Sequence, residues 1–78
     1  MQYKLWLNEY IEKQFGVVID QELENEPILG SAFHMTVPEI AYLLVEVCKH
    51  FEVPIEWVID RMDERITING LSQLLASC

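Results

Sequence analysis

The chain has 78 residues, 51% of them hydrophobic, and its 13 Asp and Glu against 5 Lys and Arg give a formal net charge of −8. The length and apolar content predict one folded domain, residues 1–78, and exclude disorder. No apolar run approaches the roughly 18–20 residues that span a membrane, and the first residues lack a signal-peptide pattern. We therefore expect a cytoplasmic protein. The negative charge disfavours nucleic-acid binding, because it repels phosphate backbones, and favours partners with basic patches.

A first helix is predicted at residues 2–15. Its apolar side chains recur at helical spacing, namely Tyr3, Leu7, Tyr10, Ile11 and Phe15. Gly16 is expected to end this helix, because glycine readily adopts the left-handed conformation found at helix ends. The VVID segment that follows is predicted to be an extended turn that holds Val18 and Ile19 on the core.

A long acidic loop, QELENEPILG, is predicted next, closed by Pro27 and Gly30. We expect Leu23, Ile28 and Leu29 to anchor it. A loop of this length in a small domain is unusual and often functional. Its alternating carboxylates lack the fixed glycine and spacing of a calcium-binding loop, so we predict a solvated acidic loop and no metal site.

The most apolar helix is predicted at residues 36–51. Thr36 can cap it, and Glu39 three residues later completes a capping box, with Pro38 tolerated in the first turn. The inward-facing stripe consists of Ile40, Leu43, Leu44, Val47 and Phe51. Further apolar positions widen it, namely Ala41, Val45 and Cys48. We therefore expect this helix to be central and covered on more than one side.

Two shorter helices are predicted to complete the chain. One begins near Pro54, and its inward-facing residues are Ile55, Val58, Ile59 and Met62. The other is capped by Thr67 and runs to about Ser77, and its apolar face consists of Ile68, Leu71, Leu74 and Leu75. The sequence therefore predicts an all-α fold of four helices, with a long first loop and a short third helix.

Signals for catalysis and metal binding are absent from the sequence. There is no glycine-rich phosphate loop, HExxH or GxSxG motif. His34 and His50 have no carboxylate or Cys at metal-ligand spacing, and Cys48 lies two positions from His50, so their side chains diverge on a helix. We expect Cys48 to be a buried thiol and Cys78 a tail thiol. These observations predict that the protein is not an enzyme.

Three segments, in this order, resemble the acyl and peptidyl carrier protein family. LNEYIEKQFGVVIDQELENEPILG is similar to the family's first helix and its acidic loop ending in Leu-Gly. AYLLVEVCKHFEVPI is similar to the second helix and the turn after it, and ERITINGLSQLL is similar to the last segment. The resemblance covers nearly the whole chain and implies an acyl carrier protein-like four-helix bundle.

The chain departs from this family at the attachment site for 4′-phosphopantetheine, which the family places on the serine of an Asp-Ser-Leu sequence at the start of the second helix. Counted forward from the Leu-Gly pair, that position falls on Phe33; counted back from the end of the helix, it falls on Val37. The counts differ because SAFHMTVP is longer than the family's segment. Ser31 is the nearby hydroxyl that a displaced attachment would use, while Thr36 is needed as a cap.

A second departure concerns the surface that binds partners. In the family, an exposed acidic face of the second helix docks on basic enzyme surfaces. Here the acidic groups are concentrated in the first loop and the third helix, so we expect the docking face to have moved. The candidate partner-binding residues are Glu22, Glu24, Glu39, Glu56 and Asp60.

The favoured hypothesis is a non-enzymatic carrier-like module without 4′-phosphopantetheine, which docks on a biosynthetic enzyme that has a basic patch. In lacking the serine, the chain resembles the acyl carrier-related proteins of bacterial peptide maturation systems, which accompany enzymes that modify ribosomally made peptides. One alternative is a functional carrier with 4′-phosphopantetheine displaced to Ser31. Another is an unrelated small helical domain that binds other proteins or a second copy of itself.

Overall fold

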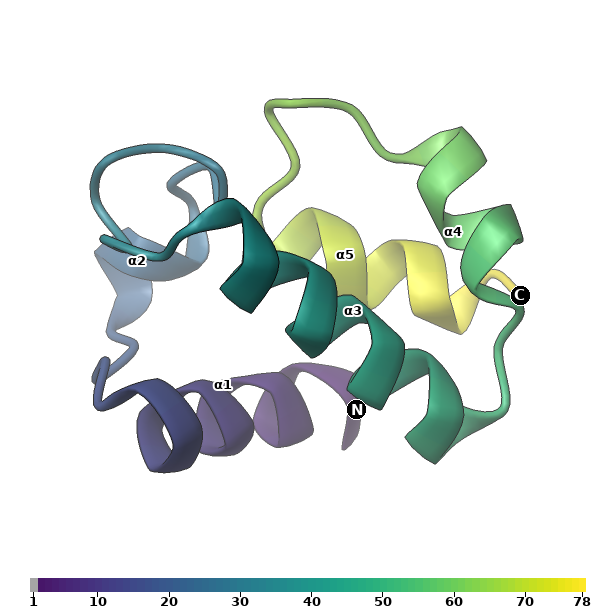
Figure 1. The fold of residues 1–78 in the computed structure, drawn as a ribbon, viewed down its shortest axis with the longest axis horizontal. Helices are drawn as coiled ribbons and strands as arrows, with labels where there is room; N and C mark the ends of the chain where they lie inside the picture. Colours follow the sequence, from purple (N-terminus) through teal and green to yellow (C-terminus); the bar gives the residue numbers. More distant parts are fainter. Residues whose placement is uncertain (1) are drawn as a thin grey trace.

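The computed structural model describes residues 2–78, and the regular secondary structure within them is entirely helical. In chain order the helices are α1 (Gln2–Phe15), α2 (Gln21–Glu24), α3 (Val37–Phe51), α4 (Ile55–Arg61) and α5 (Ile68–Ala76). In Figure 1, α3 crosses in front of α5, α1 runs below, and α2 and α4 lie at opposite sides. The predicted all-α class is confirmed, and α2 is added to the four predicted helices. No helix in residues 2–78 is both long and apolar enough to span a membrane.

The helix ends follow the local signals in the sequence. Gly16 has a φ of 72° and ends α1. At the start of α3, the Glu39 carboxylate accepts a hydrogen bond from the Thr36 N–H at 2.8 Å, and the Thr36 hydroxyl accepts one from the Glu39 N–H at 3.4 Å. Thr67 caps α5 by accepting from the N–H of Gly70 at 2.9 Å. These caps confirm the predicted starts of both helices and the predicted end of the first.

The single turn of α2 also has a local cause. The Asp20 carboxylate accepts a hydrogen bond from the Leu23 N–H at 2.9 Å, which satisfies one of the free donors at the start of the turn. Beyond α2, the chain is bound to the segment before α5, because the Ile28 N–H donates to the Ile66 carbonyl at 2.9 Å. The connection between α1 and α3 is therefore tied to the bundle rather than looped freely over it.

The core is apolar throughout and draws on every helix except α2. Its buried residues are Leu7, Ile11, Ile28, Phe33, Ile40, Leu43, Leu44, Val47, Cys48, Val53, Val58, Ile68, Leu71 and Leu75. No polar or charged side chain is buried among the residues that the structure describes. Burying one large apolar side chain contributes about 1.5–3 kcal/mol, so this set is the main source of stability. Ile28 and Phe33 come from the connection before α3, which therefore forms part of the core.

Some predicted core positions are wrong. Val18 is 68% exposed, because an extended segment alternates its side chains and here Val17 and Ile19 take the inward side. Leu29 is 42% exposed in the turn that follows the buried Ile28.

Other positions that were predicted to be buried lie on α3 and α4 and are exposed. Ile59 is 52% exposed, because α4 is short and packs through the neighbouring Val58. Ala41 and Val45 are exposed on α3 as well, since no described element covers that side of the helix. The prediction that α3 is covered on more than one side therefore holds for only part of its surface.

Candidate functional site

The two positions that correspond to the carrier attachment serine, Phe33 and Val37, have different environments in the structure. Phe33 is 0% exposed and belongs to the core. Val37 is the first residue of α3 and is 73% exposed. Ser31 follows Gly30 in the turn before Phe33, and it is exposed. Its carbonyl accepts a hydrogen bond from the His34 N–H at 3.3 Å. A hydroxyl is thus accessible at Ser31, whereas one counted position is filled by packing and the other is an exposed valine.

Glu56 and Asp60 lie one turn apart on α4, and both are exposed. A shallow depression of about 180 Å³ between α3 and α4 is lined by Val45, Cys48, Lys49, Val53 and Ile55, the residue before Glu56. Val45, which lines it, is 42% exposed, and Ile59, one turn after Ile55 on α4, is 52% exposed. We call Val45, Glu56, Ile59, Asp60 and this depression the α3–α4 surface. It combines apolar side chains and the cationic Lys49 with two carboxylates, and a mixture of apolar and charged groups is common in protein interfaces.

Trp57 lies on α4 but is not a freely exposed aromatic. The guanidinium of Arg61 is 4.3 Å from the centroid of the Trp57 ring, and Arg61 Nη1 donates to the Trp57 carbonyl at 3.2 Å. The stacked cation shields one face of a half-buried ring. Trp57 therefore acts mainly in packing, and Ile59 is the larger apolar contribution of α4 to the surface.

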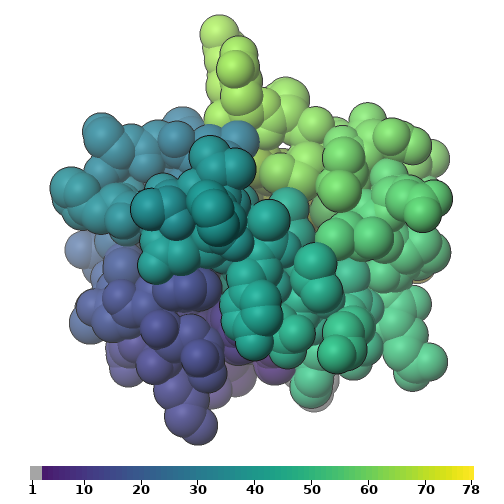
Figure 2. Space-filling view, viewed as in Figure 1, coloured from purple at the N-terminus to yellow at the C-terminus, as the bar shows by residue number. Residues whose placement is uncertain are grey.

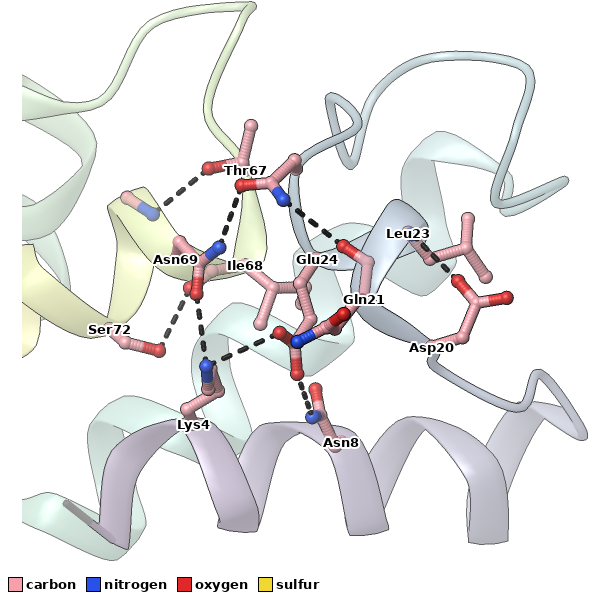
Figure 3. Close-up of polar contacts among 12 residues, drawn as sticks. Lys4, Asn8, Asp20, Gln21, Leu23, Glu24, Thr67, Ile68, Asn69 and Ser72 are labelled. Carbon is pink, nitrogen blue, oxygen red and sulfur yellow. Dashed lines mark hydrogen bonds and ion pairs between the residues drawn. The ribbon is translucent and has the colours of Figure 1, made fainter.

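Glu24 is used inside the molecule (Figure 3). Its carboxylate oxygens accept from Lys4 Nζ at 3.2 Å and from Asn8 Nδ2 at 2.9 Å, and its side chain is 15% exposed. Lys4 also donates to the Asn69 side chain at 3.3 Å, and Asn69 donates to Asn25 at 2.8 Å. We call these five residues the polar network. Because both oxygens of Glu24 are engaged with α1, this carboxylate joins helices and does not project toward a partner.

The five acidic residues predicted to bind a partner do not form one continuous face. Glu39 uses its carboxylate in the capping box of α3, and Glu24 uses its own in the polar network. Glu22 is exposed on α2, which lies across the molecule from α4 in Figure 1. Only Glu56 and Asp60 are brought together.

A group of aromatic residues between α1 and α3 was not singled out from the sequence. Trp6 stacks on Tyr10 at 4.8 Å and on His50 at 5.0 Å between ring centroids, and Phe51 packs against both Trp6 and His50. Burial, then the nearby Tyr42 and the Glu46 carboxylate, raise the pKa of Tyr10 to about 12. We call Trp6, Tyr10, Tyr42, His50 and Phe51 the aromatic seam. Its signal in the sequence was the spacing of Tyr42 and His50, two turns apart on one face of α3.

The two thiols occupy different environments. Cys48 is buried and Cys78 is exposed, as predicted, and both are free. Burial, and to a smaller extent the nearby Cys78, raises the pKa of the Cys48 thiol. Within residues 2–78, no group of three or more His, Cys, Asp or Glu side chains is arranged to hold a metal ion.

Comparisons of the chain with protein-family models, with curated proteins and with solved structures found no match. The structure alone therefore defines the class, which is a small all-helical protein with an acidic surface on α4 and an exposed apolar patch beside it. Its function has to be inferred from these surfaces and from the turn before α3.

Proposed function

We propose that this protein is a carrier-like interaction module that carries no 4′-phosphopantetheine and binds an enzyme of peptide or natural-product maturation. The observation that carries this proposal is the complete burial of Phe33. A phosphopantetheinyl transferase needs a serine hydroxyl at the surface, and this position instead supplies an apolar side chain to the core. The start of α3 is instead formed by the hydrogen bonds of the capping box between Thr36 and Glu39.

The order of the helices supports the carrier-like part of the proposal. Two long helices, α1 and α3, are followed by the short α4 and by α5, and a long connection separates the first two. The resemblance to carrier proteins implies the same order for an acyl carrier protein-like four-helix bundle. The additional turn α2 lies within the long connection and leaves this order unchanged.

The α3–α4 surface is the proposed docking site. Its apolar centre can be desolvated by a partner, while Glu56 and Asp60 at its edge attract a basic patch and orient it. Since the net charge of the chain is −8, long-range attraction also speeds the encounter with a basic enzyme.

A carrier modified at Ser31 is the second candidate function. The exposure of Ser31 in its turn favours this candidate, because a modifying enzyme can reach the hydroxyl. The residues around it do not form the Asp-Ser-Leu sequence of the family. For this reason the proposal without cofactor is preferred.

Intact-mass spectrometry separates the two candidates. The protein is co-expressed with a broad-specificity phosphopantetheinyl transferase, next to a known carrier protein as the positive control. We expect the mass of this chain to stay unchanged while the control is modified. A phosphopantetheine adduct that disappears in Ser31→Ala would overturn the proposal and establish the alternative.

Affinity capture tests the docking site. The wild type and the double charge reversal E56K/D60K are used as baits in extracts of the source cells. We expect the wild type to retain an enzyme that modifies peptides or natural products, and the variant to lose it, with weaker retention by the wild type at high salt. Recovery of the same enzyme by both baits at all salt concentrations would argue against docking through α4.

A further inference from the structure

The aromatic seam forms a pre-organised surface between α1 and α3. In Figure 2, α3 lies between α1, which shares the aromatic seam, and α4, which shares the α3–α4 surface. Trp6 is held by stacking on Tyr10, with 13° between the ring planes, and on His50, with 23°. A ring fixed in this way loses little conformational entropy when a partner covers it.

The seam and the adjoining Leu5 expose apolar area to solvent. Leu5 is 61% exposed and Tyr42 is 53% exposed. Leu5 lines a depression together with Trp6 and His50, Trp6 stacks on Tyr10, and Tyr42 is near enough to Tyr10 to raise its pKa. Aromatic residues in such patches contribute a large share of the energy at protein interfaces.

Trp6 lines two shallow depressions. The first, of about 250 Å³, is lined by Leu5, Trp6, Glu9, His50 and Phe51. The second, of about 300 Å³, is lined by Trp6, Glu9, Tyr10, Lys13 and Gln14. Because the second set is displaced along α1 by about one turn, the pair matches two side chains one turn apart on a partner helix.

The charges around the seam indicate which helix fits. The Glu9 carboxylate borders both depressions, and the Glu46 carboxylate is close enough to Tyr10 to raise its pKa. Lys13 lines the second depression and disfavours a cation there. A second copy of the chain would bring another net charge of −8, so self-association is opposed by repulsion.

We propose that the face formed by Leu5, Glu9, Glu46 and the aromatic seam binds a basic amphipathic helix of a partner protein. One apolar side chain of that helix enters the depression lined by Leu5, Trp6 and Phe51, and another, one turn further on, packs on Trp6 and Tyr10. Its Lys or Arg side chains meet Glu9 and Glu46 at the edge. This binding face is separate from the α3–α4 surface and does not depend on the absence of 4′-phosphopantetheine.

A synthetic amphipathic helix built from Leu and Arg is the probe, and a peptide in which Glu replaces Arg is its control. Binding is followed by Trp6 fluorescence in a W57F background, where Trp6 is the only tryptophan. The matched variants are L5D in the proposed face and I59D on α4, which add the same negative charge at exposed positions. We expect saturable binding of the Leu/Arg peptide, a loss of about tenfold or more in affinity in L5D, and little change in I59D.

The design separates the site from general attraction between opposite charges. Both aspartate variants are more acidic than the parent, so nonspecific electrostatics strengthens binding in each, and a loss in L5D reports the apolar contact. Equal affinities of L5D and I59D, a loss only in I59D, equally tight binding of the Leu/Glu peptide, or no saturable binding up to millimolar peptide would each overturn the proposal. A dimer in sedimentation equilibrium that L5D dissociates would assign the face to a second copy and overturn it too.

Discussion

Phe33 links the packing of the bundle to the proposed loss of the cofactor. It comes from a turn, where the sequence shows no helical periodicity, yet its ring is completely buried. Val37, the other position at which an attachment serine was expected, is at the surface and contributes no packing of this kind. The two positions therefore tolerate a serine very differently.

Phe33→Ser and Val37→Ser measure this difference. Removing a buried phenylalanine costs about 3–5 kcal/mol, and an unpaired hydroxyl in the cavity adds to the loss, so F33S should unfold at much lower urea concentrations. V37S should stay within about 0.5 kcal/mol of the wild type. Urea unfolding followed by circular dichroism gives both free energies. Similar stability of the two variants would mean that Phe33 does not pack as described.

Cys48 allows a second test at the scale of a residue. Burial keeps its thiol protonated by raising its pKa, and the thiolate is the species that reacts with labelling reagents. We therefore expect Cys78 to be labelled rapidly by a thiol reagent at mildly alkaline pH, and Cys48 only slowly. In urea the rates should become equal, and the single variants C48S and C78S assign the two phases. Rapid labelling of both thiols in the folded protein would contradict the burial of Cys48.

The raised pKa of Cys48 also sets the sign of its pH effect. The thiol ionises more easily in the unfolded chain than in the folded one. Its contribution to stability is therefore present below the unfolded pKa and is lost as the pH rises toward the folded pKa. C48S should flatten this alkaline part of the stability profile.

At the scale of the elements, the polar network joins three helices through partly exposed groups. Lys4 and Asn8 come from α1, Glu24 from α2 and Asn69 from α5. The side chain of Lys4 is 44% exposed, so solvent screens its attraction to Glu24. The Asn8 bond to the carboxylate, at 2.9 Å, is the shorter of the two contacts that Glu24 makes with α1.

Glu24→Gln tests how much this network contributes. The substitution removes the charge, and the amide of glutamine can no longer accept from both Lys4 and Asn8. We expect a loss of about 1 kcal/mol in the free energy of unfolding. Glu22→Gln changes the same charge at an exposed position on the same helix and should have almost no effect. If the two variants are equally stable, the network contributes nothing measurable.

The elements that the sequence predicted well are those with local signals. Thr36 with Glu39, Thr67 and Gly16 act within one turn of their own positions, so the boundaries they define do not depend on the rest of the fold. Asp20 is a signal of the same kind, and it marks the turn α2 that was not predicted.

The predictions that failed required knowledge of which elements meet. Ile59 has an apolar side chain at a plausible position on α4, and its exposure follows only from the direction in which this short helix packs. The aromatic seam depends on the pairing of α1 with the end of α3, which places Trp6 beside His50. Among the acids, Glu56 and Asp60 were predictable as neighbours from their spacing, whereas the internal role of Glu24 was not.

At the scale of the whole molecule, the two proposed surfaces share α3, which lies between α1 and α4 in Figure 2. A helix bound to the aromatic seam and an enzyme bound to the α3–α4 surface would not compete for the same residues. The compact core between them, with Leu43 and Val47 of α3 fully buried, provides a rigid support for both. If both proposals hold, the molecule can bring these two partners together.

The hydrogen bond from Ile28 to Ile66 has a consequence for binding entropy. A free connection of the length between α1 and α3 would sample many conformations, and a partner that contacts it would have to order them. Here the connection is held at two points. Glu24 of α2 accepts hydrogen bonds from α1, and Ile28 donates one to the segment before α5. Glu22 is therefore presented from backbone that is already in place, and a partner that uses it forgoes much of the entropic penalty of ordering a loop.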